Sequence, residues 1–147
     1  MSEVGLASAQ DLIAIRALLE HSGLPTSDLE LSRPVFAVVR ENGQVIAAGG
    51  LQHFGSSALL RSVVVARGRR GCGLGQTIVR ELERQARASH IKRLILLTQT
   101  AEEFFMRQGY RLVERSTAPE DMQRSEAFRS LCPSSANCMA KSLAETI

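Results

Sequence analysis

Residues Val63 to Thr77 read VVVARGRRGCGLGQT, and this stretch decides the fold. An apolar, β-branched run leads into a cluster of arginines, glycines then alternate with other residues, and an amphipathic pattern begins directly after them. Glycine lets successive backbone N–H groups turn into one concavity without obstruction by a Cβ atom. A helix N-terminus adds a partial positive charge and arginine adds a full one. The stretch therefore predicts a strand, a phosphate-binding loop and a helix, in that order.

The residues after this loop complete a crossover unit. Apolar residues recur at helical spacing from Leu74 to Ala86, with charged residues on the opposite face. The segment Ile91 to Thr98 is then mostly apolar, as expected for a central strand. Strand, helix and strand within this span predict a right-handed βαβ unit.

The residues before the loop predict antiparallel strands. Val35 to Arg40 and Gln44 to Leu51 flank Asn42-Gly43, the signature of a two-residue hairpin turn. Gly49-Gly50 indicates either a bulge or a close backbone approach. We therefore expect the α/β class, as a mixed α+β sheet with antiparallel N-terminal strands and a central βαβ unit.

Further elements are expected towards both ends. They are a first helix capped by Ser8, a short helix over Ser27–Ser32, a short helix over Glu102–Gln108, a strand over Tyr110–Arg115, a last helix starting at Pro119, and a strand over Asn137–Leu143.

Length and charge limit the classes of partner. The chain has 147 residues and a formal net charge of +3, which predicts one domain over residues 1–147 and does not require a polyanionic partner. The chain has no tryptophan and Tyr110 is its single tyrosine, which makes an aromatic stacking platform for nucleic acid a weak hypothesis. The longest uncharged stretch, Asn42 to Leu60, is too polar and glycine-rich for a membrane span. We expect neither a nucleic acid nor a membrane as partner.

The cysteines favour a reducing compartment. Cys72, Cys132 and Cys138 are odd in number and fit no zinc-binding spacing, and the first residues, MSEVGLASAQ, do not resemble a signal peptide. We therefore expect a cytoplasmic protein with free thiols and no metal site.

The glycine loop matches only one of the common phosphate-binding patterns. No Lys-Ser/Thr pair follows the glycines, and G-x-G-x-x-G does not fit their spacing. What remains is R-x-x-G-x-G, from Arg70 to Gly75. This pattern resembles the pyrophosphate-binding motif of the GNAT acyl-CoA N-acyltransferases. The alternative is a glycine-rich turn with solvated arginines.

Two further segments extend the resemblance over nearly the whole chain. AEEFFMRQGY, from Ala101 to Tyr110, is similar to the A-x-x-F-Y-x-x-x-G-F stretch of GNAT proteins. SLCPSSANCM, from Ser130 to Met139, looks like small GNAT proteins associated with arsenic-resistance genes, which are themselves similar to the acetyltransferase domain of N-acetylglutamate synthases. The resemblance implies transfer of an acetyl group from acetyl-CoA to the amine of a small amino acid or an amino-acid-like toxin.

The resemblance also implies a cofactor site. Val63 and Val65 would pair through their backbones with the pantetheine arm of acetyl-CoA, and the N–H of Val65 would be the catalytic donor to the thioester carbonyl. Phe105 would lie at the thiol end. The pyrophosphate would be held by Arg70, Gly71, Cys72, Gly73, Gly75, Gln76 and Thr77.

The general acid and base stay open. Phe105 stands where many GNAT enzymes have a tyrosine acid, and Tyr110 is expected in the core, so the acid is either absent or supplied from elsewhere. An α-amino group, with a pKa of about 7.7–8.0, needs little help from a base. His53 and Glu103 are candidate bases, although both residue types are more often solvated or packed.

Arg61 and Ser62 are the expected acceptor-binding residues. A guanidinium projecting into the cleft would bind an acidic group of the acceptor, and the alternative is a surface arginine. Ser130, Ser134 and Ser135 are weaker candidates for the same role, and Cys132 and Cys138 for binding trivalent arsenic, because free cysteines are commonly small buried hydrophobes.

Three functions follow from these expectations. The first is an acetyl-CoA-dependent N-acetyltransferase. The second, suggested by the missing tyrosine, is a non-catalytic CoA-binding sensor. The third, binding of nucleic acid through the clustered arginines, is the weakest. A homodimer formed through the final strand is also left open.

Overall fold

The computed structural model describes residues 2–24, 26–29, 34–131 and 136–143. Within them, seven strands form one sheet in the order β1-β2-β3-β4-β5-β7-β6, with β4 and β5 as the parallel pair and all other neighbours antiparallel. This arrangement confirms the predicted mixed α/β class. The strands are β1 Ser2–Leu6, β2 Val35–Glu41, β3 Gln44–Phe54, β4 Ser57–Val65, β5 Arg93–Thr98, β6 Arg111–Leu112 and β7 Asn137–Ser142.

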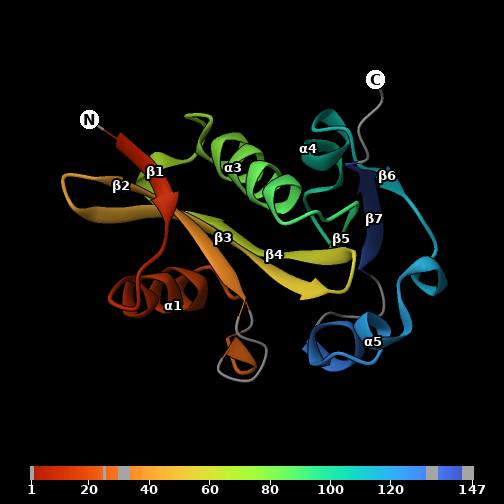
Figure 1. Cartoon of the computed structure of the whole chain (residues 1–147). Coiled ribbons are helices and arrows are strands. Elements are labelled where there is room, and N and C mark those ends of the chain that lie inside the picture. Colours follow the sequence, from red (N-terminus) through yellow and green to blue (C-terminus); the bar gives the residue numbers. More distant parts are fainter. Residues whose placement is uncertain (1, 25, 30–33, 132–135, 144–147) are drawn as a thin grey trace.

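Helices cover both faces of the sheet. Helices α3 and α4 lie on one face, and α1 and α5 lie on the other (Figure 1). The helices are α1 Asp11–His21, α3 Leu74–Ala88, α4 Glu102–Arg107 and α5 Glu120–Gln123, with short helical turns η1 Arg67–Arg69, η2 Arg115–Thr117 and η3 Ala127–Leu131. No helix among the described residues is long and apolar enough to cross a membrane.

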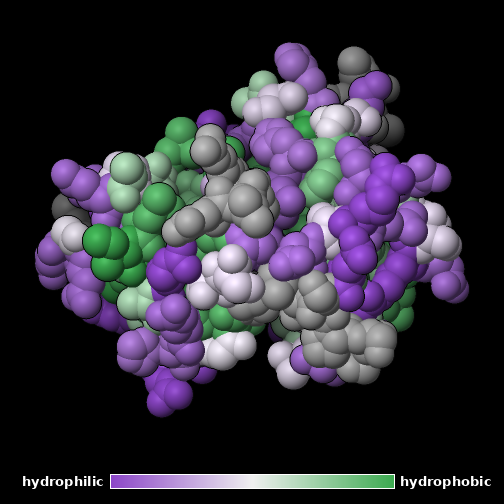
Figure 2. Space-filling view, turned by 90° about the horizontal axis from the view of Figure 1, so that it is seen from below, coloured by the Kyte–Doolittle hydropathy of each residue, from purple (hydrophilic) through white to green (hydrophobic). Residues whose placement is uncertain are grey.

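The amphipathic pattern of α3 explains how it packs. Ile78, Val79 and Leu82 are fully buried against apolar residues of β2, β3, β4 and β5. On the opposite face, Ile15 and Leu19 of α1 are buried against β2, β3 and β4. The face that carries α1 and α5 differs in hydropathy from one side to the other. Hydrophobic side chains gather on its α1 side, and hydrophilic ones dominate its α5 side (Figure 2).

The glycine pair in β3 is explained by the helix that crosses it. A Cβ atom on Gly49 would lie 2.6 Å from Cγ2 of Ile78 and 2.9 Å from Cδ1 of Leu82, so α3 approaches the strand where side chains are missing. The bulge lies on the neighbouring strand, where Ser62 and Val63 together oppose Gly49. Ser62 has a φ of 59°, which L-residues seldom adopt.

The bulge precedes a gap in the sheet. Strand β4 pairs with β5 only from Ser57 to Leu59, although it continues to Val65. Beyond Leu59 the two parallel strands separate, and the β5-facing edge of β4 has no strand partner. This open edge, next to the start of α3, positions the site described below.

Several expected elements differ from the structure. β1 was not expected, because its short sequence SEVGL has little apolar alternation and is held mainly by pairing with β2. Gln10, rather than Ser8, precedes α1, while the backbone N–H of Ser8 donates to the Asp11 carboxylate at 2.7 Å. The last helix is divided into α5 and η3. Half of the helix expected over Ser27–Ser32, residues 30–32, lies outside the described residues.

Candidate functional site

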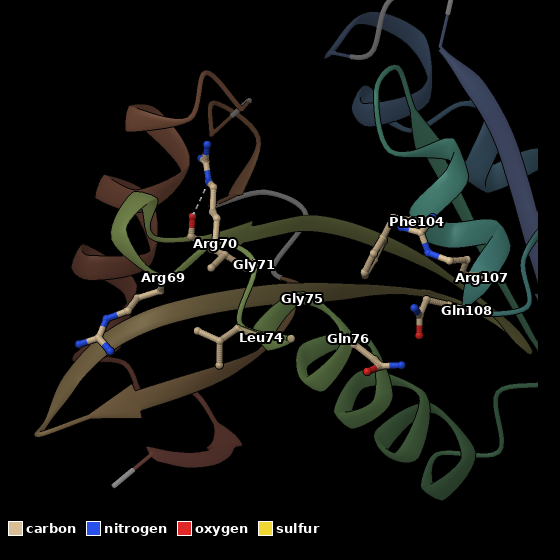
Figure 3. A pocket seen from close by; sticks show the side chains of 11 residues that line it. Arg69, Arg70, Gly71, Leu74, Gly75, Gln76, Phe104, Arg107 and Gln108 are labelled. Carbon is tan, nitrogen blue, oxygen red and sulfur yellow. Dashed lines mark hydrogen bonds between the residues drawn. The ribbon is translucent and has the colours of Figure 1, made fainter.

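A cavity of about 500 Å³ opens between the end of β4, the start of α3 and helix α4 (Figure 3). Of the described residues, arginines but no acidic side chain line its walls, so its charge favours an anionic ligand. The residues lining it are Val65, Arg69, Arg70, Gly71, Gly73, Leu74, Gly75, Gln76, Phe104, Arg107 and Gln108.

The glycine loop has the backbone expected of an anion-binding turn. Gly71 and Gly73 have φ values of 84° and 79°, and α3 begins at Leu74. The first N–H groups of a helix have no partner within it, so they are available to a ligand at this end. Phe104 lies opposite, with its ring 3.4 Å from where a Cβ atom of Gly75 would stand. The loop and α4 therefore face each other across the cavity.

The predicted cofactor residues divide into two groups. Those that the structure brings to the cavity are Val65, Arg70, Gly71, Gly73, Gly75 and Gln76. Val63, Cys72, Thr77 and Phe105 do not line it. The Thr77 hydroxyl donates to the Gly73 carbonyl at 3.1 Å, and the exposed Cys72 is a free thiol.

Arg70 holds the end of β4. Its Nε donates to the Val65 carbonyl at 3.2 Å and its Nη2 donates to the Ser22 hydroxyl at 3.2 Å, so the guanidinium connects the loop to the end of α1. In Figure 3 this side chain points away from the helix start. Arg69 pairs with Glu41. The neutralisation of a pyrophosphate by the Arg70 guanidinium stays a prediction.

The open edge of β4 offers backbone groups to a ligand. The N–H of Ala66 donates to the Ile46 carbonyl of β3 at 2.8 Å. Because N–H groups alternate in direction along a strand, that of Val65 faces the opposite edge, which β5 leaves open. Val63 belongs to the bulge, where this alternation is interrupted, so the pairing of its backbone with the pantetheine arm stays a prediction.

Phe105 does not line the cavity, although it was expected at the thiol end of the cofactor. Phe105 is buried and packs edge to face against Tyr110, with ring centroids 5.6 Å apart, while the preceding Phe104 lines the cavity. Adjacent helical residues point about 100° apart, so both cannot face the ligand. Tyr110 lies in the core as expected. Burial raises the pKa of Tyr110 far above its ordinary value, and so does the Glu83 carboxylate, which accepts a hydrogen bond from the hydroxyl.

Arg61 also differs from its expected role. Both of its terminal nitrogens donate to the Asp28 carboxylate, at 2.5 and 2.6 Å, and Nη1 also donates to the Gln52 side chain at 3.1 Å. Only 8% of the Arg61 side chain is exposed. The arginine is thus committed to a buried ion pair, and its Nε donates to the Ser62 hydroxyl at 3.3 Å beside the bulge.

The remaining candidates are not gathered at the cavity. His53 and Glu103 are exposed and lie outside its lining. Cys138 is buried, which raises the pKa of its thiol. Cys132, Ser134, Ser135 and the side chain of Ser130 lie outside the described part of the chain. Among the described residues, no group of His, Cys, Asp and Glu side chains could hold a metal ion.

Sequence analysis expected this helix at the site through Phe105 but missed the residues that line the cavity. Phe104, Arg107 and Gln108 form the wall opposite the loop, and Arg107 extends from the end of α4 (Figure 3). Leu74 lines the cavity from the loop side. The one available signal was the position of AEEFFMRQGY directly after the second strand of the βαβ unit, because strand ends adjoin the ligand crevice in such sheets.

The chain also matches a known protein family. Residues 11–110 match the Acetyltransferase (GNAT) family, and the chain belongs to that family. The predicted class, acetyltransferase, is confirmed. An amino-acid acetyltransferase of Ralstonia nicotianae is 26% identical over 91 residues, which are 60% of this chain and 20% of that protein.

Solved structures share the fold over almost the whole chain. N-acetylglutamate synthase of Neisseria gonorrhoeae, solved with coenzyme A and N-acetyl-glutamate, has a TM-score of 0.84 at 19% identity, covering 99% of this chain and 36% of that one. Rv2747 of Mycobacterium tuberculosis, solved with CoA and NLQ, has a TM-score of 0.82 at 24% identity, covering 97% and 99%. The chain thus spans about a third of the synthase and nearly all of Rv2747.

Proposed function

We propose that this chain is an acetyl-CoA-dependent N-acetyltransferase that acts on the amino group of a small amino acid. The observation that carries the proposal is the glycine loop at the start of α3, opposite Arg107 and beside the open edge of β4. The loop amides and the positive end of α3 suit a diphosphate, and the β4 edge suits the amides of a pantetheine arm. We further propose that residues 1–147 work as one domain, supported by the insertion of β7 between β5 and β6.

The chemistry is a direct transfer. The neutral amine attacks the thioester carbonyl carbon, so that a C–N bond forms and the C–S bond breaks. The attacking nitrogen loses a proton to solvent, and the departing thiolate of CoA takes up a proton from solvent. The N–H of Val65 donates to the carbonyl oxygen while negative charge develops on it. Tyr110 takes no part in proton transfer, because its hydroxyl is buried on Glu83.

The acceptor class rests on the relatives. One is named an amino-acid acetyltransferase, and a structural neighbour was solved with N-acetyl-glutamate. An α-amino group is partly neutral near pH 8, which suits a site where no described base lines the cavity. Amino acids that contain arsenic or phosphorus belong in the acceptor panel, because SLCPSSANCM resembles proteins associated with arsenic resistance.

The loop is tested by a charge placed at Gly73. Gly73→Asp puts a carboxylate where the diphosphate is expected, so we predict loss of CoA binding by at least about a hundredfold in calorimetry. Gly55→Asp is the matched control, because Gly55 also has a positive φ of 64° and open space around it but lies in the β3–β4 turn. Equal CoA affinity in both variants would contradict the site.

The absence of a tyrosine acid at Phe105 favours a second candidate, a CoA-binding sensor without catalysis. Thiol release from acetyl-CoA with a panel of amino acids separates the two. Turnover with any of these amines supports the enzyme, whereas tight CoA binding with no turnover across the panel supports the sensor.

A further inference from the structure

A buried charged cluster joins α3, the end of α4 and β7. Glu83 of α3 is 5% exposed, and its carboxylate accepts hydrogen bonds from Nζ of Lys141, at 3.1 Å to each oxygen, and from the hydroxyl of Tyr110, at 2.9 Å. A buried carboxylate requires such partners, because burial removes the water that would otherwise stabilise it. None of these side chains lines the cavity.

Lys141 connects this cluster to the cavity wall. Its Nζ also donates to the Gln108 carbonyl at 2.8 Å, and Gln108 and the preceding Arg107 both line the cavity. The next residue, Gly109, has a φ of 97°, and a Cβ atom on it would lie 3.2 Å from Cε of Lys141. Glycine at this position therefore leaves room for the lysine to reach the end of α4.

A second line of contacts leads from the cluster to the glycine loop. The ammonium of Lys141 lies 5.5 Å from the ring centroid of Tyr110. Tyr110 and Phe105 pack edge to face, as do Phe105 and Phe104, whose ring centroids are 5.0 Å apart. The Phe104 ring in turn lies 3.4 Å from where a Cβ atom of Gly75, at the start of α3, would stand. These two sets of contacts connect the cluster to both α3 and α4, the helices on opposite sides of the cavity.

We infer that Lys141 and Glu83 are positioning residues for the acyl donor, because they fix the end of α4 relative to α3 and so set the width of the cavity. This inference rests on the cofactor site proposed above. Lys141 acts through the Gln108 carbonyl and Glu83 acts through Lys141, and neither touches the ligand. An ion pair that served stability alone would leave the affinity of the folded protein for CoA unchanged.

The double variant Glu83→Gln/Lys141→Met tests this role. It removes both charges together, so no buried charge is left unpaired, and glutamine still offers an oxygen to the Tyr110 hydroxyl. We expect the Kd for CoA and the KM for acetyl-CoA to rise about fivefold or more, with kcat and the KM of the acceptor unchanged. The single variant Lys141→Met, which leaves the Glu83 charge buried, should in addition unfold at a lower temperature.

Arg84→Met is the matched control. Arg84 is an exposed residue of the same helix whose hydrogen bonds among the described residues go to Glu81, so its loss should leave the Kd for CoA within twofold of the wild type. A double variant with wild-type CoA affinity, alongside a Gly73→Asp variant that has lost it, overturns the positioning role alone. Wild-type affinity in both overturns the cavity as the CoA site, and the positioning role with it.

Discussion

Arg61 carries a full charge on β4 next to the bulge, yet its side chain is only 8% exposed and donates hydrogen bonds to Asp28 and Gln52. Removing one member of a buried ion pair takes a charged partner from the other member, which burial has already separated from water. We therefore predict that Arg61→Ala lowers the free energy of unfolding by about 3–5 kcal/mol, measured by urea denaturation. An Arg61→Ala variant of wild-type stability whose acceptor KM alone is raised would show that the residue binds substrate instead.

Arg107 lines the cavity and makes no ion pair or side-chain hydrogen bond with any of the described residues. The other two arginines of the cavity, Arg69 and Arg70, each have such a partner. Arg107 is exposed and lies across the cavity from the glycine loop. We predict that Arg107→Gln weakens CoA binding about tenfold, and that added salt weakens wild-type binding more than that of the variant.

The control for Arg107 is Arg111→Gln, an exposed arginine of β6 outside the cavity. Comparing CoA with dephospho-CoA then identifies the phosphate concerned, because a contact to the 3′-phosphate affects CoA alone. If Arg107→Gln and Arg111→Gln bind CoA equally well, Arg107 has no part in the site.

Among the elements, α3 and β3 are fitted to each other at Gly49. Any Cβ atom there would overlap Ile78 and Leu82 of the helix. We predict that Gly49→Ala lowers the free energy of unfolding by about 1–3 kcal/mol. Gly5→Ala, in open space on β1, should change it by less than about 1 kcal/mol, and thermal or urea unfolding of both variants checks the difference. Equal stability of the two variants would refute the close approach.

Elements with a strong local pattern were predictable. The stripe of α3 and the Asn42-Gly43 turn, whose residues both have positive φ, carry their own signals. β1 was missed because pairing with β2, rather than its composition, holds it in place. Gly49 was ambiguous, since the sequence does not show that α3 crosses it or that the extra residue of the bulge lies on β4.

For the molecule as a whole, the site depends on segments that meet only after folding. The phosphate loop could be recognised because its residues are consecutive, and the family confirmed the predicted class. The segment of the opposite wall was recognised too, but not that Phe104 and Arg107 line the cavity, because this depends on the separation of β4 from β5 and on the placement of α4. The structural role of Arg61 could not be predicted either. Its partner Asp28 lies 33 residues earlier, and nothing in the sequence indicates that the two side chains meet.

The place of β7 in the sheet has a consequence for how the protein is made. During translation, Lys141 leaves the ribosome 58 residues after its partner Glu83. Strand β6 also has no neighbour in the sheet until β7 has been made. Until that last strand emerges, the nascent chain has an uncompensated carboxylate under α3 and an unfinished sheet edge. Chaperones and proteases would therefore meet an incomplete sheet until β7 has left the ribosome.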